Sequence, residues 1–433
     1  MSSGRATGCP AVRLPWIARG PVTSDRCLCG PRVRPEIVSR RLNDVGILAA
    51  IAVTSGRSAA RKHSAWSSAC GCTIGANAHY SACFRGPGLQ VLIAVNCAIV
   101  TRGLSGTARG VQHFVECVSR RADTDVERLW PTRKLRRSRV WNAGVQAWWD
   151  MSGAAAAAGS ADVLVSPCNI GRARGRQRHI LVVLDTMALD HPEWFDRGFA
   201  AYARALGGVS VAGASVILVP SDYTKRCVAA RWPSAPPTVV ARYPFTIAER
   251  DLDAVDRRRI LMVGATEVHK RHDLAIEAVR AARERSGEDL HLVIVGPRGR
   301  AEAMIEVAVR EADPRAAWIE RRVNITDVEL NREYDVAGSL IHTSAGEGYG
   351  LPVGEAAARG MPSVHSGAGS LPEIAPGAVD YPERAESYSA AILALFDSGA
   401  YAAASEAALH AVRQVNSTAY AAAVDRAITV AVS

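Results

Sequence analysis

Residues 343–362 read TSAGEGYGLPVGEAAARGMP, and this stretch decides the fold. An apolar run at 339–344 leads into a glycine-rich turn, and Pro352 stands where the first residue of a helix would. Glycine lets a backbone approach a ligand closely, and a helix N-terminus offers free N–H groups to a diphosphate. Glu347 falls in the turn, and Glu355 falls about one turn into the expected helix. The pattern predicts a phosphate-binding strand–turn–helix that carries two carboxylates.

A second glycine-rich stretch, GAGSLPE at 367–373, follows the next apolar run. Ser370 and Glu373 have the S-x-x-E spacing of a capping box, which predicts another helix start here. Two such starts after adjacent strands converge on one place, as a phosphate site requires. A glycosidase is an alternative, since its two acids stand about 5–9 Å apart across a sugar. Because one acid here lies in a turn and the other on a helix, we expect them to grip different parts of one ligand. Capped helices with solvated acids are the remaining alternative.

Outside this stretch, short apolar runs alternate with helical stretches in two successive series. Such runs suit strands buried on both faces, as in parallel sheets covered by helices. The two series predict the α/β class, with two doubly wound, Rossmann-like domains facing each other across a cleft. We expect domains at 88–248 and 249–414, a polar linker at 249–259, and a last helix at 415–433 that crosses back to the first domain. The expected strands are 89–96, 162–167, 179–185, 215–221, 259–264, 291–296, 339–344 and 361–366, with a helix at 273–287.

The formal net charge of +10 is unevenly distributed over the 433 residues. Residues 1–87 hold 12 Lys and Arg against 3 Asp and Glu, whereas the rest of the chain holds 40 against 39. A nearly neutral main fold gives no reason to expect a nucleic-acid partner. Residues 1–87 lack a sustained period. They are expected to be either a disordered, basic, cysteine-containing extension or the product of a start site assigned too far upstream.

Cysteine and tryptophan placement bears on the compartment. The C-x-C pairs within 1–87 lack the usual spacing of zinc ligands, so incidental cysteines are favoured over a zinc site. No apolar run approaches the roughly 20 residues that span a bilayer. The stretch 133–150 combines basic residues with tryptophans, which predicts either a peripheral contact at the inner face of the membrane or a helix whose tryptophans pack on the sheet. The cysteines outside residues 1–87 are expected to be reduced, as in a cytoplasmic protein; they are Cys97, Cys117, Cys168 and Cys227.

Residues 258–374 resemble the nucleotide-binding domain of the retaining GT-B glycosyltransferases of family 4, within the glycosyl transferases group 1. The E-x7-E pattern from Glu347 to Glu355, with GYGLP between, is the most specific match. MVGATEVHKRHDLAIEA at 262–278 is similar to the family's strand, phosphate-binding loop and helix. GSLPEI at 369–374 matches the loop that the family places against the donor phosphates.

The first domain is also similar to the family. LSGTARGVQHFVECVSRR at 104–121 resembles the glycine-rich loop and helix near the acceptor, with Gly106 as the close-approach glycine. Residues 162–169, 182–195 and 216–228 are most similar to the mannosyl- and rhamnosyltransferase branch, which builds cell-surface polysaccharides. The resemblance covers about 88–430 and implies the GT-B fold.

The resemblance implies that a hexose, mannose or rhamnose, passes from a nucleotide diphosphate-sugar to a cell-surface polysaccharide or a lipid-linked glycan. Glu355 would hold the ribose hydroxyls, Glu347 the sugar hydroxyls and Lys270 the diphosphate. Glu347, Lys270 and Asp185 form the expected catalytic set, and no metal or other cofactor is expected. The expected donor-binding residues are Gly264, Lys270, Glu347, Gly348, Tyr349, Gly350, Leu351, Glu355, Ser370 and Leu371.

Two residues depart from the family's pattern. Leu184 precedes Asp185 where the family often has histidine, and Leu cannot donate a hydrogen bond to the transferred sugar. Ala265 follows Gly264 where an arginine or threonine is common. The alternative function is therefore a catalytically degenerate GT-B protein that binds nucleotide or glycan without turnover. Asp123-Thr124-Asp125 is a D-x-D sequence that we expect to be a solvated turn rather than a metal site.

Overall fold

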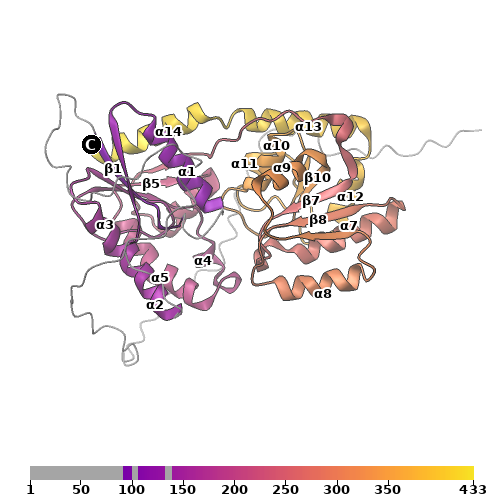
Figure 1. Ribbon diagram of the computed structural model, residues 1–433, viewed down its shortest axis with the longest axis horizontal. Coiled ribbons are helices and arrows are strands. Elements are labelled where there is room, and N and C mark those ends of the chain that lie inside the picture. The colour runs from indigo at the N-terminus through magenta and orange to yellow at the C-terminus, as the bar shows by residue number, and fades with distance from the viewer. Residues whose placement is uncertain (1–90, 100–105, 132–138) are drawn as a thin grey trace, which may run out of the picture. The chain divides into compact units, whose positions relative to one another are not determined.

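The computed structural model describes residues 91–99, 106–131 and 139–433, which lie within the compact unit Arg85–Ser433. They contain one sheet of six strands and one of five, and helices flank both sheets (Figure 1). Every pairing between neighbouring strands is parallel. The expected α/β class with two Rossmann-like folds is confirmed. We call the parts built on the six-stranded and five-stranded sheets the N-terminal lobe and the C-terminal lobe.

The sheet of the N-terminal lobe has the strand order β2-β1-β3-β4-β5-β6. Its central strands β3 and β5 are buried throughout, because helices cover both faces of the sheet. The elements are β1 (Val91–Asn96), α1 (Gly106–Ser119), β2 (Thr124–Leu129), α2 (Arg139–Trp148), the π-helical turn η2 (Trp149–Gly153), α3 (Ala154–Ala157), β3 (Val163–Ser166), β4 (Arg178–Val182), α4 (Met187–Asp190), the 3-10 turn η3 (Pro192–Trp194), α5 (Arg197–Ala212), β5 (Val216–Val219), α6 (Asp222–Arg231) and β6 (Thr238–Val240).

The sheet of the C-terminal lobe has the strand order β11-β10-β7-β8-β9. Helix α7 is capped at its C-terminus by Gly287, whose φ of +72° lies in the left-handed region where glycine is favoured. The elements are the 3-10 turn η4 (Leu252–Ala254), β7 (Asp256–Val263), the 3-10 turn η5 (Val268–Lys270), α7 (His272–Ser286), β8 (His291–Val295), α8 (Glu302–Ala312), β9 (Ile319–Arg322), α9 (Asp327–Val336), β10 (Ala337–His342), α10 (Leu351–Ala357), β11 (Ser363–His365), α11 (Leu371–Ile374), α12 (Ala385–Ala394), α13 (Ser398–Arg413) and α14 (Ser417–Val432).

Three strands escaped the sequence analysis, and one of them corrects an expectation. Edge strand β2 begins at Thr124 and pairs in parallel with β1. Asp123 ends an exposed turn, whereas Thr124 and Asp125 already belong to the strand, so the expected solvated turn is only partly correct. The strands β6 and β9 were also missed. Strands β6 and β9 are short, and β2 and β9 carry charged residues, because an edge strand buries less of its surface than a central one. Strand β7 begins at Asp256, so the polar stretch 249–259 is only partly a linker.

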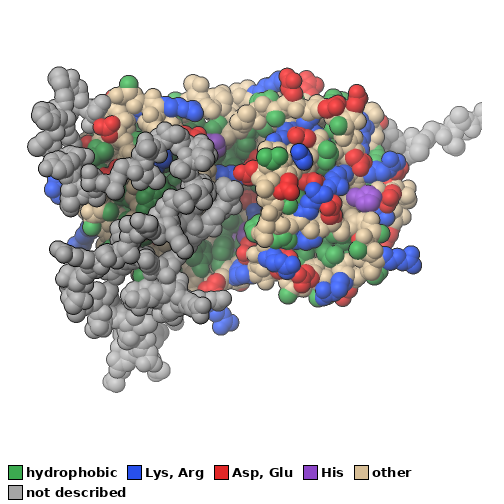
Figure 2. Space-filling model, in the orientation of Figure 1, with side chains coloured by type: hydrophobic (Ala, Val, Ile, Leu, Met, Phe, Trp, Pro, Cys, Tyr) green, Lys and Arg blue, Asp and Glu red, His purple; other side chains and the backbone are tan. Residues whose placement is uncertain are grey.

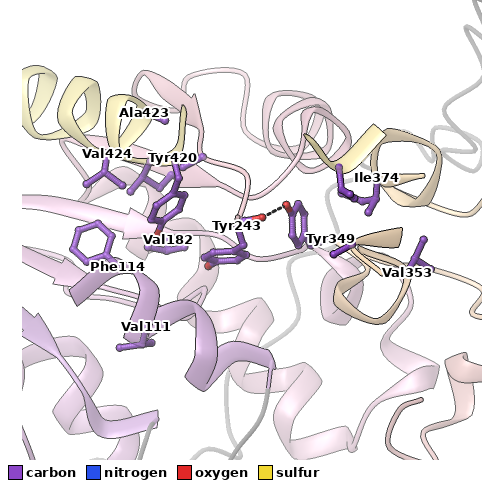
Figure 3. Close-up of a cluster of buried hydrophobic side chains, with 14 of the residues drawn as sticks. Val111, Phe114, Val182, Tyr243, Tyr349, Val353, Ile374, Tyr420, Ala423 and Val424 are labelled. Carbon is purple, nitrogen blue, oxygen red and sulfur yellow. Dashed lines mark hydrogen bonds between the residues drawn. The ribbon is translucent and has the colours of Figure 1, made fainter. Parts of the chain in front are cut away.

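A cluster of buried hydrophobic side chains runs from one lobe into the other (Figure 3). Helix α14 supplies Tyr420 and Val424 to it and packs on strands β3 to β6 of the N-terminal lobe. Tyr243, which follows β6, lies between Tyr420 and Tyr349 from the glycine-rich turn of the C-terminal lobe. The last helix therefore ties the end of the chain to the first sheet.

The remaining expectations concern the surface and the termini. Residues 1–87 and 132–138 lie outside the described residues. Among the described helices, none is long and apolar enough to cross a membrane. Of the tryptophans in the stretch 133–150, Trp149 is buried and Trp148 is 38% exposed. Cys97, Cys117, Cys168 and Cys227 are free cysteines. Acidic and basic side chains are interspersed over the face of the C-terminal lobe shown in Figure 2.

Candidate functional site

The glycine-rich turn after β10 is held against the N-terminal lobe. The carbonyl oxygen of Gly348 accepts hydrogen bonds from Ser221 Oγ at 2.7 Å and from Thr224 Oγ1 at 3.1 Å. A Cβ atom on Gly348 would lie 2.2 Å from the carbonyl oxygen of Leu184, so only glycine fits this contact. Gly350 has a φ of +93°, which turns the chain into α10. Gly348 therefore serves close backbone packing between the two lobes, and Gly350 serves the turn into α10.

Glu347 is the best-anchored carboxylate of the turn. Its Oε1 atom pairs with Lys270 Nζ and lies 2.8 Å from His342 Nε2. The side chain is 9% exposed, and burial alone would raise its pKa. The charge of Lys270 and the hydrogen bond from His342 outweigh burial and hold the pKa of Glu347 well below its usual range. Glu347 is thus a carboxylate at neutral pH, and no described residue donates a hydrogen bond to its Oε2 atom.

Asp185 approaches this pair from the N-terminal lobe. It follows β4, and its Oδ1 atom accepts a hydrogen bond from the backbone N–H of Met187 at 3.0 Å. Burial and the charge of Glu347 raise the pKa of Asp185 to about 6, against the opposing effects of the Met187 hydrogen bond and of Lys270. The structure therefore brings together the three residues of the expected catalytic set, two carboxylates and one ammonium.

Glu355 lies in a separate cluster of charges. Its Oε1 atom is 2.5 Å from Arg109 Nη1 of helix α1, and its Oε2 atom accepts a hydrogen bond from Tyr334 OH at 2.8 Å. Arg109 also contacts Asp327 at 2.6 Å, so one guanidinium bridges two carboxylates of the C-terminal lobe. Burial raises the pKa of Glu355, and Arg109 partly offsets this effect. The sequence analysis missed Arg109, although it follows Gly106 by about one turn of helix α1.

The other expected donor-binding residues divide into two groups. Gly264 has room beside it, since a Cβ there would come no closer than 3.9 Å to Lys270 Cδ. Leu351 is partly exposed and packs closely on helix α1, where a Cβ on Gly106 would lie 2.9 Å from Leu351 Cδ1. Tyr349, Ser370 and Leu371 are buried. Tyr349 stacks on Phe245 with 5.7 Å between ring centroids and donates a hydrogen bond to the carbonyl of Tyr243 at 2.5 Å. Its side chain belongs to the core, and only its backbone is left to face a ligand.

The expected capping box at Ser370 and Glu373 does not form. Ser370 Oγ instead donates a hydrogen bond to the carbonyl of Glu347 at 3.2 Å. The Glu373 carboxylate accepts the N–H groups of Asp222 at 2.8 Å and of Tyr223 at 2.7 Å, so it caps α6 of the other lobe. Glu373 therefore accepts the free N–H groups at the start of a helix that is far away in sequence, and residue spacing alone could not reveal this contact.

The two helices that follow the glycine-rich stretches are short. Helix α10 has seven residues and α11 has four, so their dipoles are weak sources of positive charge. Lys270 and Arg109 are therefore the stronger cations of this region. Leu184 and Ala265 add no polar side chain to it. Among the described residues, no group of three or more His, Cys, Asp or Glu side chains could hold a metal ion.

Comparison with known proteins first defines the fold. The chain is similar to sucrose-phosphate synthase from Thermosynechococcus elongatus, with a TM-score of 0.62 and 15% identity over 78% of this chain and 98% of that one. HepE from Anabaena gives a TM-score of 0.62 and 13% identity over 78% and 100% of the two chains. The lipopolysaccharide outer core galactosyltransferase WaaB gives 0.53 and 14% over 78% and 99%. The protein has the GT-B fold that these structures share.

The sequence of the C-terminal lobe matches a known class of domain. Residues 257–398 match the family model described as glycosyl transferases group 1. No curated protein matches the chain at a significant level. The matched residues include Lys270, Glu347 and Glu355, and with the fold they support a glycosyltransferase.

Proposed function

We propose that the protein is a retaining glycosyltransferase that moves a hexose from a nucleoside diphosphate-sugar to a glycan acceptor. The observation that carries the proposal is the meeting of Lys270, Glu347 and Asp185 at the junction of the lobes. A carboxylate oxygen accepts hydrogen bonds from sugar hydroxyls, and Glu347 Oε2 is free to do so. An ammonium group stabilises the negative charge that develops on a leaving diphosphate.

The Glu355 cluster suits the ribose of the same donor. Each carboxylate oxygen has a second lone pair beyond its bond to Arg109 or Tyr334, and that lone pair can accept a ribose hydroxyl. Arg109 adds a positive charge from the N-terminal lobe. The solved structure of HepE contains UDP and glucose, which makes uracil the first base to test.

The reaction proposed is a substitution at the anomeric carbon of the sugar. The acceptor hydroxyl oxygen bonds to this carbon, and the bond from the carbon to the diphosphate oxygen breaks. The hydroxyl proton passes to a phosphate oxygen of the leaving group, so the acceptor attacks from the face that the nucleotide leaves and the configuration is retained. Lys270 neutralises the leaving group, and Glu347 orients the sugar. The resemblance to family 4 supports retention, and we expect no requirement for a metal.

Nucleotide binding is the first test. Thermal unfolding is followed with UDP, GDP, TDP and ADP and with their hexose esters. A ligand at 100 times its Kd stabilises the fold by about 2.7 kcal/mol. We expect one base to raise the melting temperature, Glu355→Ala to abolish the shift, and Glu277→Ala, which removes a 60% exposed carboxylate of α7, to preserve it. No shift with any of the eight compounds would contradict the proposal.

Turnover separates the enzyme from a degenerate binding protein. We expect the unchanged chain to release nucleoside diphosphate from the nucleotide-sugar it binds, and EDTA to leave the rate unchanged. Glu347→Gln keeps the size of the side chain and removes its charge, so it should abolish release and preserve nucleotide binding. Nucleotide binding without release, with or without extracts of cell-surface glycans, would favour the degenerate alternative.

A lipid-linked or cell-surface polysaccharide acceptor, with mannose or rhamnose as the sugar, remains part of the proposal. The partly exposed Trp148 and the basic residues before α2 support a peripheral contact at the inner face of the membrane. Flotation with vesicles that contain 30% anionic lipid, roughly a biological fraction, tests this contact. We expect salt-sensitive binding that Trp148→Ala weakens, and the same binding to purely zwitterionic vesicles would contradict it.

A further inference from the structure

His269 lies directly before Lys270 and is fixed to the turn that carries Glu347. Its carbonyl oxygen accepts hydrogen bonds from the N–H of Ala345 at 2.7 Å and from Ser344 Oγ at 3.3 Å. The backbone of His269 therefore moves with the Glu347 turn. The charges of Lys270 and Glu347 both act on the His269 ring, so this ring lies beside the pair.

Two aromatic side chains of the N-terminal lobe hold the imidazole ring. Trp194 stacks on His269 with 5.9 Å between centroids and 23° between planes, and Phe195 stacks with 5.9 Å and 22°. Trp194 is in turn stacked on His191 at 3.9 Å. A Cβ on Gly346 would lie 3.0 Å from the Trp194 ring, so this ring also packs against the residue before Glu347. The ring of His269 is thus clamped at the edge of the candidate site.

The clamped ring has unused hydrogen-bonding capacity. His269 is 8% exposed, yet neither ring nitrogen forms a hydrogen bond with a described residue, and Nδ1 is sealed from solvent. Burial, and secondly the charge of Lys270, lower the pKa of His269 to about 4, so the ring is neutral at pH 7. A polar group that lacks a partner is unfavourable to desolvate, so a ligand that supplies a partner to Nε2 binds more favourably.

The chemistry of a neutral imidazole selects the ligand group. Because Nδ1 is sealed, Nε2 is the nitrogen that a ligand can reach, and in the neutral ring it either donates or accepts according to the tautomer. A hydroxyl group can both accept and donate, so it complements Nε2 in either tautomer. A phosphate at neutral pH offers acceptors only, and it is better served by the neighbouring Lys270. We propose that His269 recognises a hydroxyl group of the transferred sugar, and that Trp194 and Phe195 are positioning residues that hold its ring. This inference rests on the proposed function, since it assigns the sugar end of the same donor site.

The test compares a nucleoside diphosphate with its hexose ester, because only the ester carries the sugar. Calorimetry gives both Kd values for the base selected by thermal unfolding. His269→Phe keeps a flat ring for stacking and removes both nitrogens. We expect the Kd of the nucleoside diphosphate to change less than about twofold, and that of the hexose ester to rise about tenfold. His269→Gln, which keeps a donor and an acceptor, should recover part of the loss.

The positioning role has its own variants. Trp194→Ala should raise the Kd of the hexose ester selectively, and Trp194→Phe should restore it because a ring still covers the imidazole. Phe199→Ala is the matched control: this ring is 47% exposed and contacts Phe195 rather than His269, so neither Kd should change. Melting temperatures of all variants verify that they fold.

Three results would overturn the inference. If His269→Phe weakens both ligands equally, or neither, its nitrogens do not recognise the sugar. If Trp194→Ala and Phe199→Ala act alike, the clamp has no positioning role. If the unchanged chain binds no nucleoside diphosphate, the proposed function fails and this inference fails with it.

Discussion

Replacing Arg109 by alanine should expose how strongly the two lobes are coupled at Glu355. Arg109 makes one contact of 2.5 Å to Glu355 and one of 2.6 Å to Asp327. Hydrogen bonds to charged groups contribute about 1.5–3 kcal/mol each, and exposed ion pairs about 0–1 kcal/mol. The Glu355 side chain is 20% exposed and that of Asp327 is 54% exposed, so the Glu355 contact dominates. We expect Arg109→Ala to lower the free energy of unfolding by about 2 kcal/mol and the melting temperature by about 3 °C.

The loss should depend on pH in a defined direction. Burial raises the pKa of Glu355, and Arg109 lowers it, so Arg109→Ala raises it further. A carboxyl group whose pKa is higher in the folded than in the unfolded state destabilises the fold when it is ionised. Stability is regained as the pH falls through the folded pKa. The deficit of Arg109→Ala should therefore be largest at pH 8 and shrink towards pH 5.

Thermal and urea unfolding at pH 5 and pH 8 measure this deficit. Asp327→Asn is the control, because it removes the more exposed carboxylate and should cost about 0.5 kcal/mol or less. Arg109→Lys retains the charge but not the two-pronged geometry, and it should fall between alanine and the unchanged protein. An equal deficit at both pH values, or none, would refute the view that Arg109 acts as the counter-charge of Glu355.

Three further predictions concern the site and its support. A Cβ on Gly354 would lie 2.0 Å from Phe245 Cζ, so Gly354→Ala should lower the free energy of unfolding by about 1–3 kcal/mol. The control Gly144→Ala, in an open helical position, should instead raise the free energy of unfolding by about 0.5–1 kcal/mol. Equal effects of the two substitutions would contradict the packing argument. Because burial raises the pKa of Asp185 to about 6, the stability of the unchanged protein relative to Asp185→Asn should fall as the pH rises from about 4 to 6; parallel stability curves would show that Asp185 is not buried as described. His342→Leu removes one of two donors to Glu347 Oε1 and should slow transfer about tenfold or more, whereas His342→Gln should stay within about threefold because its amide still donates; equal rates for the two variants would exclude His342 as a positioning residue.

Much of the fold could be predicted from local patterns. The apolar runs at 162–167 and 215–221 correctly predicted strands β3 and β5. A strand that is buried on both faces is apolar along its whole length, so its own sequence is enough to identify it. Strand β2 was missed, since its sequence TDVERL is charged and lies at a sheet edge. Its neighbour β1, and not its own composition, made it a strand.

The candidate site was predictable only in part. Glu347, Glu355 and Lys270 stood out through their motifs, whereas the partners of these residues did not. Arg109 lies 246 residues from Glu355 in sequence, so no spacing rule connects them. Tyr349 was expected at the ligand because it lies within the motif, but the aromatic rings of Tyr243 and Phe245 draw its side chain into the core.

By itself, the sequence determined the α/β class, the strand–turn–helix around Glu347 and the glycines that allow its backbone to turn, because these follow from contacts between near neighbours in the chain. Only the tertiary structure decided that Glu373 caps α6, that His342 and Lys270 share one oxygen of Glu347, and that Trp194 and Phe195 clamp His269. These contacts join segments that the order of strands and the packing of the lobes bring together. Their energies depend on burial and distance, which no stretch of sequence contains on its own.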